Sequence, residues 1–210
     1  MEKVINTKEE RIFLDSLKDI VKSARKYAYS SICFAQVQSN WMLGKRIVEQ
    51  IQKGNDKAEY GKHILKIASE SLTEEFGKGY DESNLRYMRL FYKTFPICDA
   101  LRHELSWTHY RRLLSIENED ARIWYMNEAA NSMWSTRQLD RQISTLYYNR
   151  LLASHDKKIV IEEAEEKLQK VIPEEFIKDP YILEFLDLKD YSTLRESDIE
   201  KSLINNLQDF

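Results

Sequence analysis

Apolar side chains recur at helical spacing along most of the chain. Thr7 and Glu10 have capping-box spacing. They precede an apolar stripe at alternating three- and four-residue steps, formed by Leu14, Leu17, Val21, Ala24 and Ala28. A second helix is predicted through Trp41, Val48 and Ile51, and it should end near Gly54. The 210 residues include only five glycines and three prolines, which favours long helices over a turn-rich β fold.

Residues 60–96 predict a helix, a sharp turn and a second helix. The first helix has a stripe made of Tyr60, Ile64, Ala68, Leu72 and Phe76. Gly77 and Gly79 permit the positive φ angles of a reversal, and Asp81 can cap the helix that follows. That helix places Leu85, Met88, Tyr92 and Phe95 on one face and Glu82, Arg86, Arg89 and Lys93 on the other. The pattern indicates a helix-turn-helix-like pair with a mainly basic outer face.

A further series of helices is predicted over 104–116, 118–134 and 135–152. Ser135 and Gln138 have capping-box spacing at the start of the last one. Its inward face should hold Leu139, Ile143, Leu146 and Tyr147, and its outer face Arg137, Arg141, Ser144 and Tyr148. The expected fold class is therefore all-α, a helical bundle with helix-turn-helix-like pairs.

The charge distribution divides the chain near His155. Residues 1–155 hold 24 Lys and Arg against 20 Asp and Glu, a net charge of +4, whereas residues 156–210 hold 8 against 15, a net charge of −7. We predict a helical, DNA-binding-like domain over 1–155, a linker near 153–158, and an acidic helical extension over 156–210. A mildly basic body permits nucleic-acid binding but does not require it.

Several chemistries lack sequence support. The chain has no P-loop, dinucleotide fingerprint, nucleophile elbow or zincin motif. Its two cysteines, Cys33 and Cys98, are too far apart in sequence to indicate a Cys-based zinc site or a disulfide framework. No window has the apolar length of a membrane span, so the expected location is a reducing cytoplasm.

One short constellation resembles a catalytic one. His109 and Arg112, followed by Tyr147 or Tyr148, are similar to the His-x-x-Arg and later Tyr of tyrosine recombinases. Short patterns of this kind recur by chance, and a packed, hydrogen-bonded histidine is the favoured interpretation of His109. Trp107, Trp124 and Trp134 are likewise expected in the core rather than on a base-stacking surface.

Two interpretations of the basic faces remain open. In the first, Arg86, Arg89 and Lys93, and secondarily Arg137 and Arg141, contact DNA phosphates, while Ser83 and Asn84 at the start of their helix reach bases. In the second, the domain is a protein-interaction or dimerisation module, and the basic residues are only a solvated face. Split or covered basic stripes would favour the second interpretation.

A set of spaced motifs carries a family resemblance. The motifs are Trp41 with Gly44, Tyr60-Gly61-Lys62, Phe76-Gly77-Lys78-Gly79, Asn84-Leu85-Arg86, Phe91-Tyr92, Leu105-Ser106-Trp107 with His109, Trp134-Ser135, Asp179-Pro180 and Leu183-Glu184-Phe185-Leu186. With them the chain resembles the YhcG-like family of PD-(D/E)XK nucleases, over its helical N-terminal domain.

The resemblance implies a helical domain that engages DNA or partners, followed by an α/β nuclease domain that binds Mg²⁺ through carboxylates. A homodimer is the partner expected if the domain is instead a dimerisation module. Glu200 matches the first acidic position of the family's nuclease, and the later carboxylate and lysine strands are absent from this sequence. We therefore expect that this chain alone does not cleave DNA.

Overall fold

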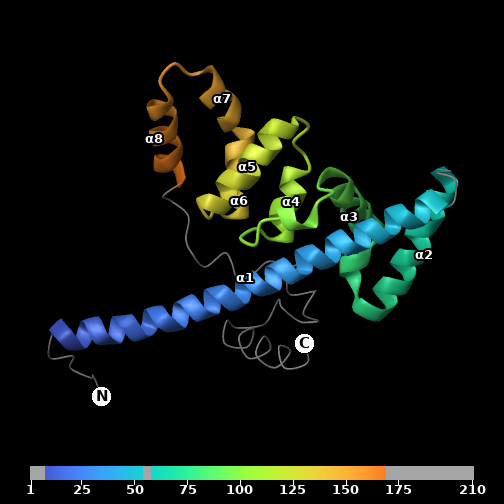
Figure 1. Ribbon diagram of the computed structural model, residues 1–210, viewed down its shortest axis with the longest axis horizontal. Helices are drawn as coiled ribbons and strands as arrows, with labels where there is room; N and C mark the ends of the chain where they lie inside the picture. The colour runs from blue at the N-terminus through green and yellow to red at the C-terminus, as the bar shows by residue number, and fades with distance from the viewer. Residues whose placement is uncertain (1–7, 54–57, 169–210) are drawn as a thin grey trace.

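The computed structural model describes residues 8–53 and 58–168, and within them the fold is helical without strands (Figure 1). The α-helices are α1 (Lys8–Lys53), α2 (Ala58–Phe76), α3 (Glu82–Thr94), α4 (Trp107–Leu113), α5 (Glu119–Asn131), α6 (Thr136–Ser144), α7 (Tyr147–Ala153) and α8 (Lys157–Leu168). Two 3-10 helices, η1 (Lys78–Tyr80) and η2 (Cys98–Ala100), lie in the connections. The all-α prediction is confirmed.

The prediction of two helices before Gly54 is wrong, because α1 is one continuous helix of 46 residues. Its two halves have different apolar faces. At 3.6 residues per turn, the stripe through Leu17 and Val21 lies on nearly the opposite side of the helix from the stripe through Val37 and Trp41. The change of face resembles a helix boundary in the sequence. In Figure 1 the N-terminal half of α1 extends beyond α2–α8.

The C-terminal half of α1 packs closely on α3. A Cβ placed on Gly44 would lie 2.0 Å from the Met88 carbonyl oxygen, so the two helix backbones meet where α1 has no side chain. Trp41 Nε1 donates a 2.7 Å hydrogen bond to the Phe95 carbonyl, and Val37 and Leu85 are fully buried nearby. This crossing fixes the position of α3, whose opposite face remains at the surface.

The connection from α2 to α3 forms as predicted. Gly77 adopts φ +94°, in the left-handed region that favours glycine, while Gly79 lies in the 3-10 helix η1. The Asp81 carboxylate then accepts a 2.8 Å hydrogen bond from the Asn84 amide and caps α3. The predicted helix, turn and helix over 60–96 are confirmed.

An aromatic core joins α3 to the second half of the chain. Phe91 of α3 lies 5.3 Å from Trp107 and 4.9 Å from Tyr110 of α4 between ring centroids, and all three side chains are buried. Trp134 is also buried, as expected. The packing holds α3 and α4 in a fixed relation.

The single helix predicted over 135–152 is two helices. The Ser135–Gln138 capping box forms, but α6 ends at Ser144, and Leu146, at φ 51°, is 60% exposed rather than facing inward. A side chain of α5 binds both sides of the break. The Tyr125 hydroxyl donates to the Gln142 carbonyl and accepts from the Tyr148 amide, both at 3.0 Å. This buried hydroxyl bridges the two helix ends, which the spacing of α6 and α7 alone did not indicate.

The first part of the acidic extension packs against the body. Residues 154–156 connect α7 to α8, Ala164 of α8 is 2% exposed, and Arg150 of α7 forms a 2.8 Å ion pair with Glu163. The expected linker near 153–158 thus corresponds to a short connection. The remainder of the extension, with Glu200, lies outside the described residues.

Candidate nucleic-acid interface

The predicted basic stripe occupies the outer face of α3. Arg86 and Lys93 are exposed and Arg89 is half-buried, while the inner face of the helix buries Leu85, Met88 and Phe91. Arg86 forms a 2.6 Å ion pair with Glu82, one turn earlier, and both side chains remain substantially exposed. An exposed pair of this kind is worth little and can be exchanged for a phosphate contact. The structure therefore brings the three predicted α3 cations together.

The two residues predicted to reach bases differ in position. Ser83 is exposed at the start of α3. Asn84 is 7% exposed, and its Nδ2 donates a 3.0 Å hydrogen bond to the Gly79 carbonyl. Because its amide is engaged within the turn, the geometry assigns Asn84 to turn closure and gives no support to base contact.

Charge is unevenly distributed along α3. The first turn carries Asp81 and Glu82, and the cations follow one to three turns later. Arg111 of α4 adds a further cation beside this helix, with its guanidinium carbon 4.3 Å from the centroid of the Tyr87 ring. Sequence reasoning did not assign Arg111 to the interface, because its position depends on how α4 crosses α3. A phosphate backbone would thus meet favourable charge along the last two turns of α3.

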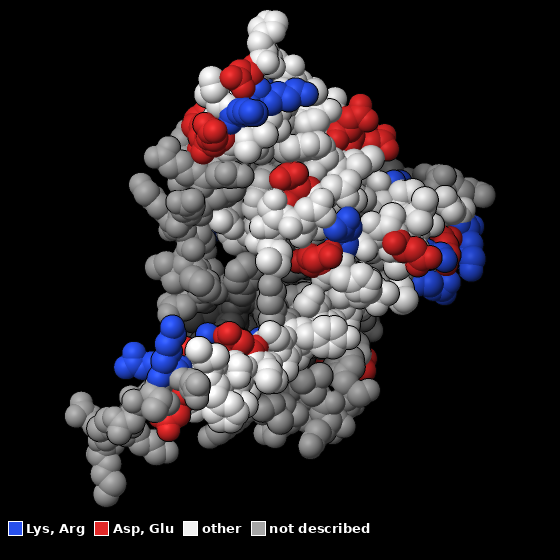
Figure 2. All heavy atoms as spheres, turned by 60° about the vertical axis from the view of Figure 1, so that its left-hand side comes forward, with Lys and Arg blue, Asp and Glu red and all other residues white. Residues whose placement is uncertain are grey.

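The predicted secondary contacts, Arg137 and Arg141, are exposed on α6. In Figure 1 α4 lies between α3 and α6, so these arginines do not extend the α3 stripe continuously. The α4–α6 contact includes Arg112 Nε, 3.5 Å from an Asp140 carboxylate oxygen. On the face shown in Figure 2, Lys and Arg likewise gather in separate patches with Asp or Glu beside them.

Of the recombinase-like residues, His109 and Tyr147 are buried inside the fold, whereas Arg112 is exposed. The Ser106 amide donates to His109 Nδ1 at 3.1 Å, which leaves Nε2 to donate to the Trp134 carbonyl at 2.9 Å. His109 is 4% exposed and Tyr147 is 5% exposed. The interpretation of His109 as a packed, hydrogen-bonded residue is confirmed.

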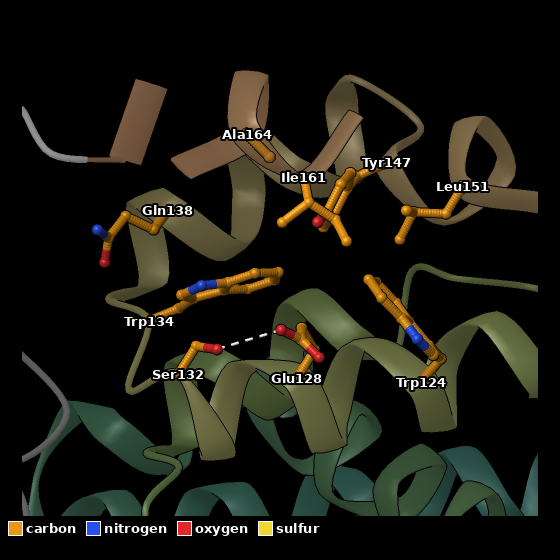
Figure 3. A pocket seen from close by; sticks show the side chains of 9 residues that line it. All are labelled: Trp124, Glu128, Ser132, Trp134, Gln138, Tyr147, Leu151, Ile161 and Ala164. Carbon is orange, nitrogen blue, oxygen red and sulfur yellow. Dashed lines mark hydrogen bonds between the residues drawn. The ribbon is translucent and has the colours of Figure 1, made fainter. Parts of the chain in front are cut away.

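A pocket of about 320 Å³ lies between α8 and helices α5, α6 and α7 (Figure 3). Trp124, Trp134 and Tyr147 line it with the aliphatic side chains of Leu151 and Ile161. Its polar edge includes Glu128, whose carboxylate accepts a 3.1 Å hydrogen bond from the Ser132 hydroxyl. The lining is aromatic and mostly apolar, and we interpret the pocket as the seam where α8 meets the body.

The described helices show neither a cluster of metal ligands nor a membrane-spanning segment. Residues 8–53 and 58–168 contain no group of three or more His, Cys, Asp or Glu side chains arranged to hold a metal ion. Over the same ranges, every helix is too short or too polar to span a bilayer.

Comparison with known proteins identifies relatives of the chain. A family model described as the DUF1016 N-terminal domain matches residues 16–150. The protein named "Putative nuclease YhcG" of Escherichia coli (strain K12) is 35% identical over 229 aligned positions, covering 93% of this chain and 60% of that relative. The chain thus spans less than two thirds of the length of this relative. No solved structure matches the chain significantly.

Proposed function

The chain belongs to the DUF1016 N-terminal domain family. From that premise we propose that its helical domain delivers a nuclease to DNA by binding phosphates on the outer face of α3. The observation that carries the proposal is the row of exposed Arg86, half-buried Arg89 and exposed Lys93 on a helix that α1 holds from behind. Phosphate contacts of this type position a protein on a duplex without reading its sequence.

The strength of the interaction follows from the number of cations. Three α3 side chains, or four with Arg111, predict a slope of log K against log salt of roughly −3 to −4, at about −0.9 for each neutralised phosphate. The acidic Asp81 and Glu82 lie at the start of the same helix and oppose deeper insertion of its N-terminus. We therefore expect weak, sequence-tolerant binding.

Cleavage belongs to the complete nuclease-family protein in this proposal. Mg²⁺ would be bound by carboxylates of the nuclease portion, with Glu200 as one ligand, as the resemblance to the nuclease family implies. The helical domain contributes position, not chemistry, and a cytoplasmic location gives it access to DNA.

Fluorescence anisotropy with labelled duplex and branched DNA at several salt concentrations tests the proposal. The triple variant R86A/R89A/K93A should weaken binding to unrelated sequences and flatten the salt slope by about 3. The matched control R11A/K18A/K22A removes the same charge from the N-terminal half of α1, and it should retain the slope. Equal losses in the two variants would show that only net charge matters and would contradict an α3 interface.

The second candidate function is a protein-interaction or dimerisation module that needs no DNA contact. The separated basic patches in Figure 2 favour it, as does the interruption between α3 and α6. Absence of binding at about 50 mM salt, where screening is weak, would make this the better account.

A further inference from the structure

The N-terminal half of α1 carries an apolar stripe, exposed except at half-buried Leu14 and Ala28, and formed by Phe13, Leu14, Leu17, Ile20, Val21, Ala24, Tyr27 and Ala28. Its large side chains are 60% exposed at Phe13, 44% at Leu17, 66% at Ile20, 51% at Val21 and 78% at Tyr27. Five of the stripe residues, Leu14, Leu17, Val21, Ala24 and Ala28, follow at alternating steps of three and four residues, the repeat by which one helix packs against another in a coiled coil. Monomers rarely expose a contiguous apolar surface of this size without a partner for it.

The chain's own body covers the face of this stripe only beyond Ala28, where Ile32, five turns after Leu14, is 7% exposed. The residues of α1 that pack on α3, among them Val37 and Trp41, lie on nearly the opposite side of the helix axis. The N-terminal half also extends beyond α2–α8 in Figure 1. The stripe therefore faces away from the contacts that α1 makes with α3.

Charge restricts the identity of the partner. Between Phe13 and Ala28, Lys18 pairs with Asp15 at 2.9 Å and Lys22 with Asp19 at 3.6 Å, and these four charged side chains lie off the stripe. The side chains that form the stripe are themselves uncharged, so they offer a phosphate backbone or an acidic or basic partner no opposite charge. A surface of the same composition meets it without like-charge repulsion.

We propose that two copies of this chain pair through the stripe, with the N-terminal halves of their α1 helices antiparallel. The helix is already anchored to the body, by the Ser30 hydroxyl donating to the His103 carbonyl at 3.0 Å and by Phe34 stacked on the His103 ring at 3.6 Å. A preformed helix has less conformational entropy to lose on association than a segment that must fold.

Residue sizes along the stripe favour the antiparallel arrangement. In the antiparallel register that pairs Leu17 with Ile20 of the second copy, Phe13 faces Ala24, so the bulkiest of these four side chains meets the smallest one. In the parallel arrangement Phe13 would face Phe13 and Ala24 would face Ala24, leaving one layer crowded and another hollow. The antiparallel pair places the two bodies at opposite ends of the contact.

The contact area indicates a moderate affinity. Covering the stripe on both copies would bury on the order of 1,000 Å² in total, near the lower limit for a specific interface. We therefore expect a dimer with a dissociation constant in the micromolar range, which forms whether or not DNA is present.

Sedimentation velocity of the 210-residue chain from about 1 to 100 µM tests the pairing. We expect a concentration-dependent shift from a monomer of 25.1 kDa to a dimer. L17E/I20E should raise the dissociation constant at least tenfold, while the far-UV circular dichroism of the monomer stays unchanged. The control K18Q/K22Q alters net charge by the same −2 on the opposite face and should dimerise like the unmodified chain.

Cross-linking tests the orientation. With oxidised glutathione, F13C/A24C should form disulfide-linked dimers, whereas F13C alone should form few. Efficient cross-linking by F13C alone would overturn the antiparallel register.

Two further outcomes would overturn the pairing itself. One is a dimer that L17E/I20E leaves intact, which would place the interface elsewhere. The other is a chain that remains monomeric at 100 µM and loses thermal stability in L17E/I20E, which would show that a segment of the same chain covers the stripe.

Discussion

Replacing Gly44 by Ala tests the close crossing of α1 and α3. The new Cβ would lie 2.0 Å from the Met88 carbonyl oxygen, 2.7 Å from the Met88 carbonyl carbon and 3.2 Å from Tyr92 Cβ, whereas real contacts essentially never fall below 3.0 Å. The close atoms belong to backbone and cannot rotate away. The helices must therefore separate locally by roughly 1 Å, a gap that forfeits about a quarter to a half of the dispersion attraction across it.

The expected loss of stability follows from opposing contributions. Overpacking of this kind costs about 1–3 kcal/mol, and a clash with backbone belongs at the upper end of that range. Alanine returns up to about 1 kcal/mol through its higher helix propensity. We expect the free energy of unfolding to fall by about 2 kcal/mol, equivalent to a decrease in Tm of roughly 4–8 °C for a chain of this size.

Gly61→Ala supplies the matched control. A Cβ at Gly61 would meet only the Ile51 side chain, at 3.6 Å or more, so the same substitution should stabilise α2 by up to about 1 kcal/mol. Urea titrations followed by circular dichroism at 222 nm would measure both variants against the unmodified chain. A G44A variant as stable as G61A would refute the backbone contact between α1 and α3.

Two other predictions concern buried tyrosines. Tyr125→Phe removes the hydroxyl that bridges Gln142 and Tyr148, and it should lower the free energy of unfolding by about 1–3 kcal/mol in urea titrations, since the buried Gln142 carbonyl loses its donor and the part-buried Tyr148 amide its acceptor; an unchanged urea midpoint would contradict the bridge. Burial raises the pKa of Tyr110 well above its usual range, so its contribution to stability should be intact below the unfolded-state pKa of about 10 and decline as pH rises from there, because the unfolded chain releases the proton first. Urea titrations from pH 8 to 11 should show a shallower decline for Tyr110→Phe, and an identical decline in both proteins would contradict the assignment.

The elements that the sequence predicts best are those where periodicity and local capping agree. The pair α2 and α3 has both signals, with Gly77 in the turn and Asp81 at the cap, and it forms as expected. Helix α1 was divided wrongly because its apolar face changes side midway, and periodicity cannot distinguish a new helix from a new partner. The break at Leu146 depends on a hydroxyl from α5, which is invisible to any local pattern.

The candidate interface shows the same division. Local spacing placed Arg86, Arg89 and Lys93 on one outer face, because their positions follow from helix geometry alone. The burial of Asn84 depends on its amide folding back to Gly79, and the place of Arg111 depends on the crossing of α4 over α3. Both features depend on tertiary contacts. Local spacing therefore predicts the basic stripe but not the burial of Asn84 or the position of Arg111 beside it.

The attachment of α8 has a mechanical consequence. Residues 154–156 leave little slack between α7 and α8, and the Arg150–Glu163 pair ties the two helices together across that corner. A helix of 12 residues is a lever of about 18 Å, so tilting α8 by about 10° on its seat would displace its far end by roughly 3 Å. The pocket lined by Trp124 and Trp134 adjoins α8, so such a tilt would change the space between these rings and the helix.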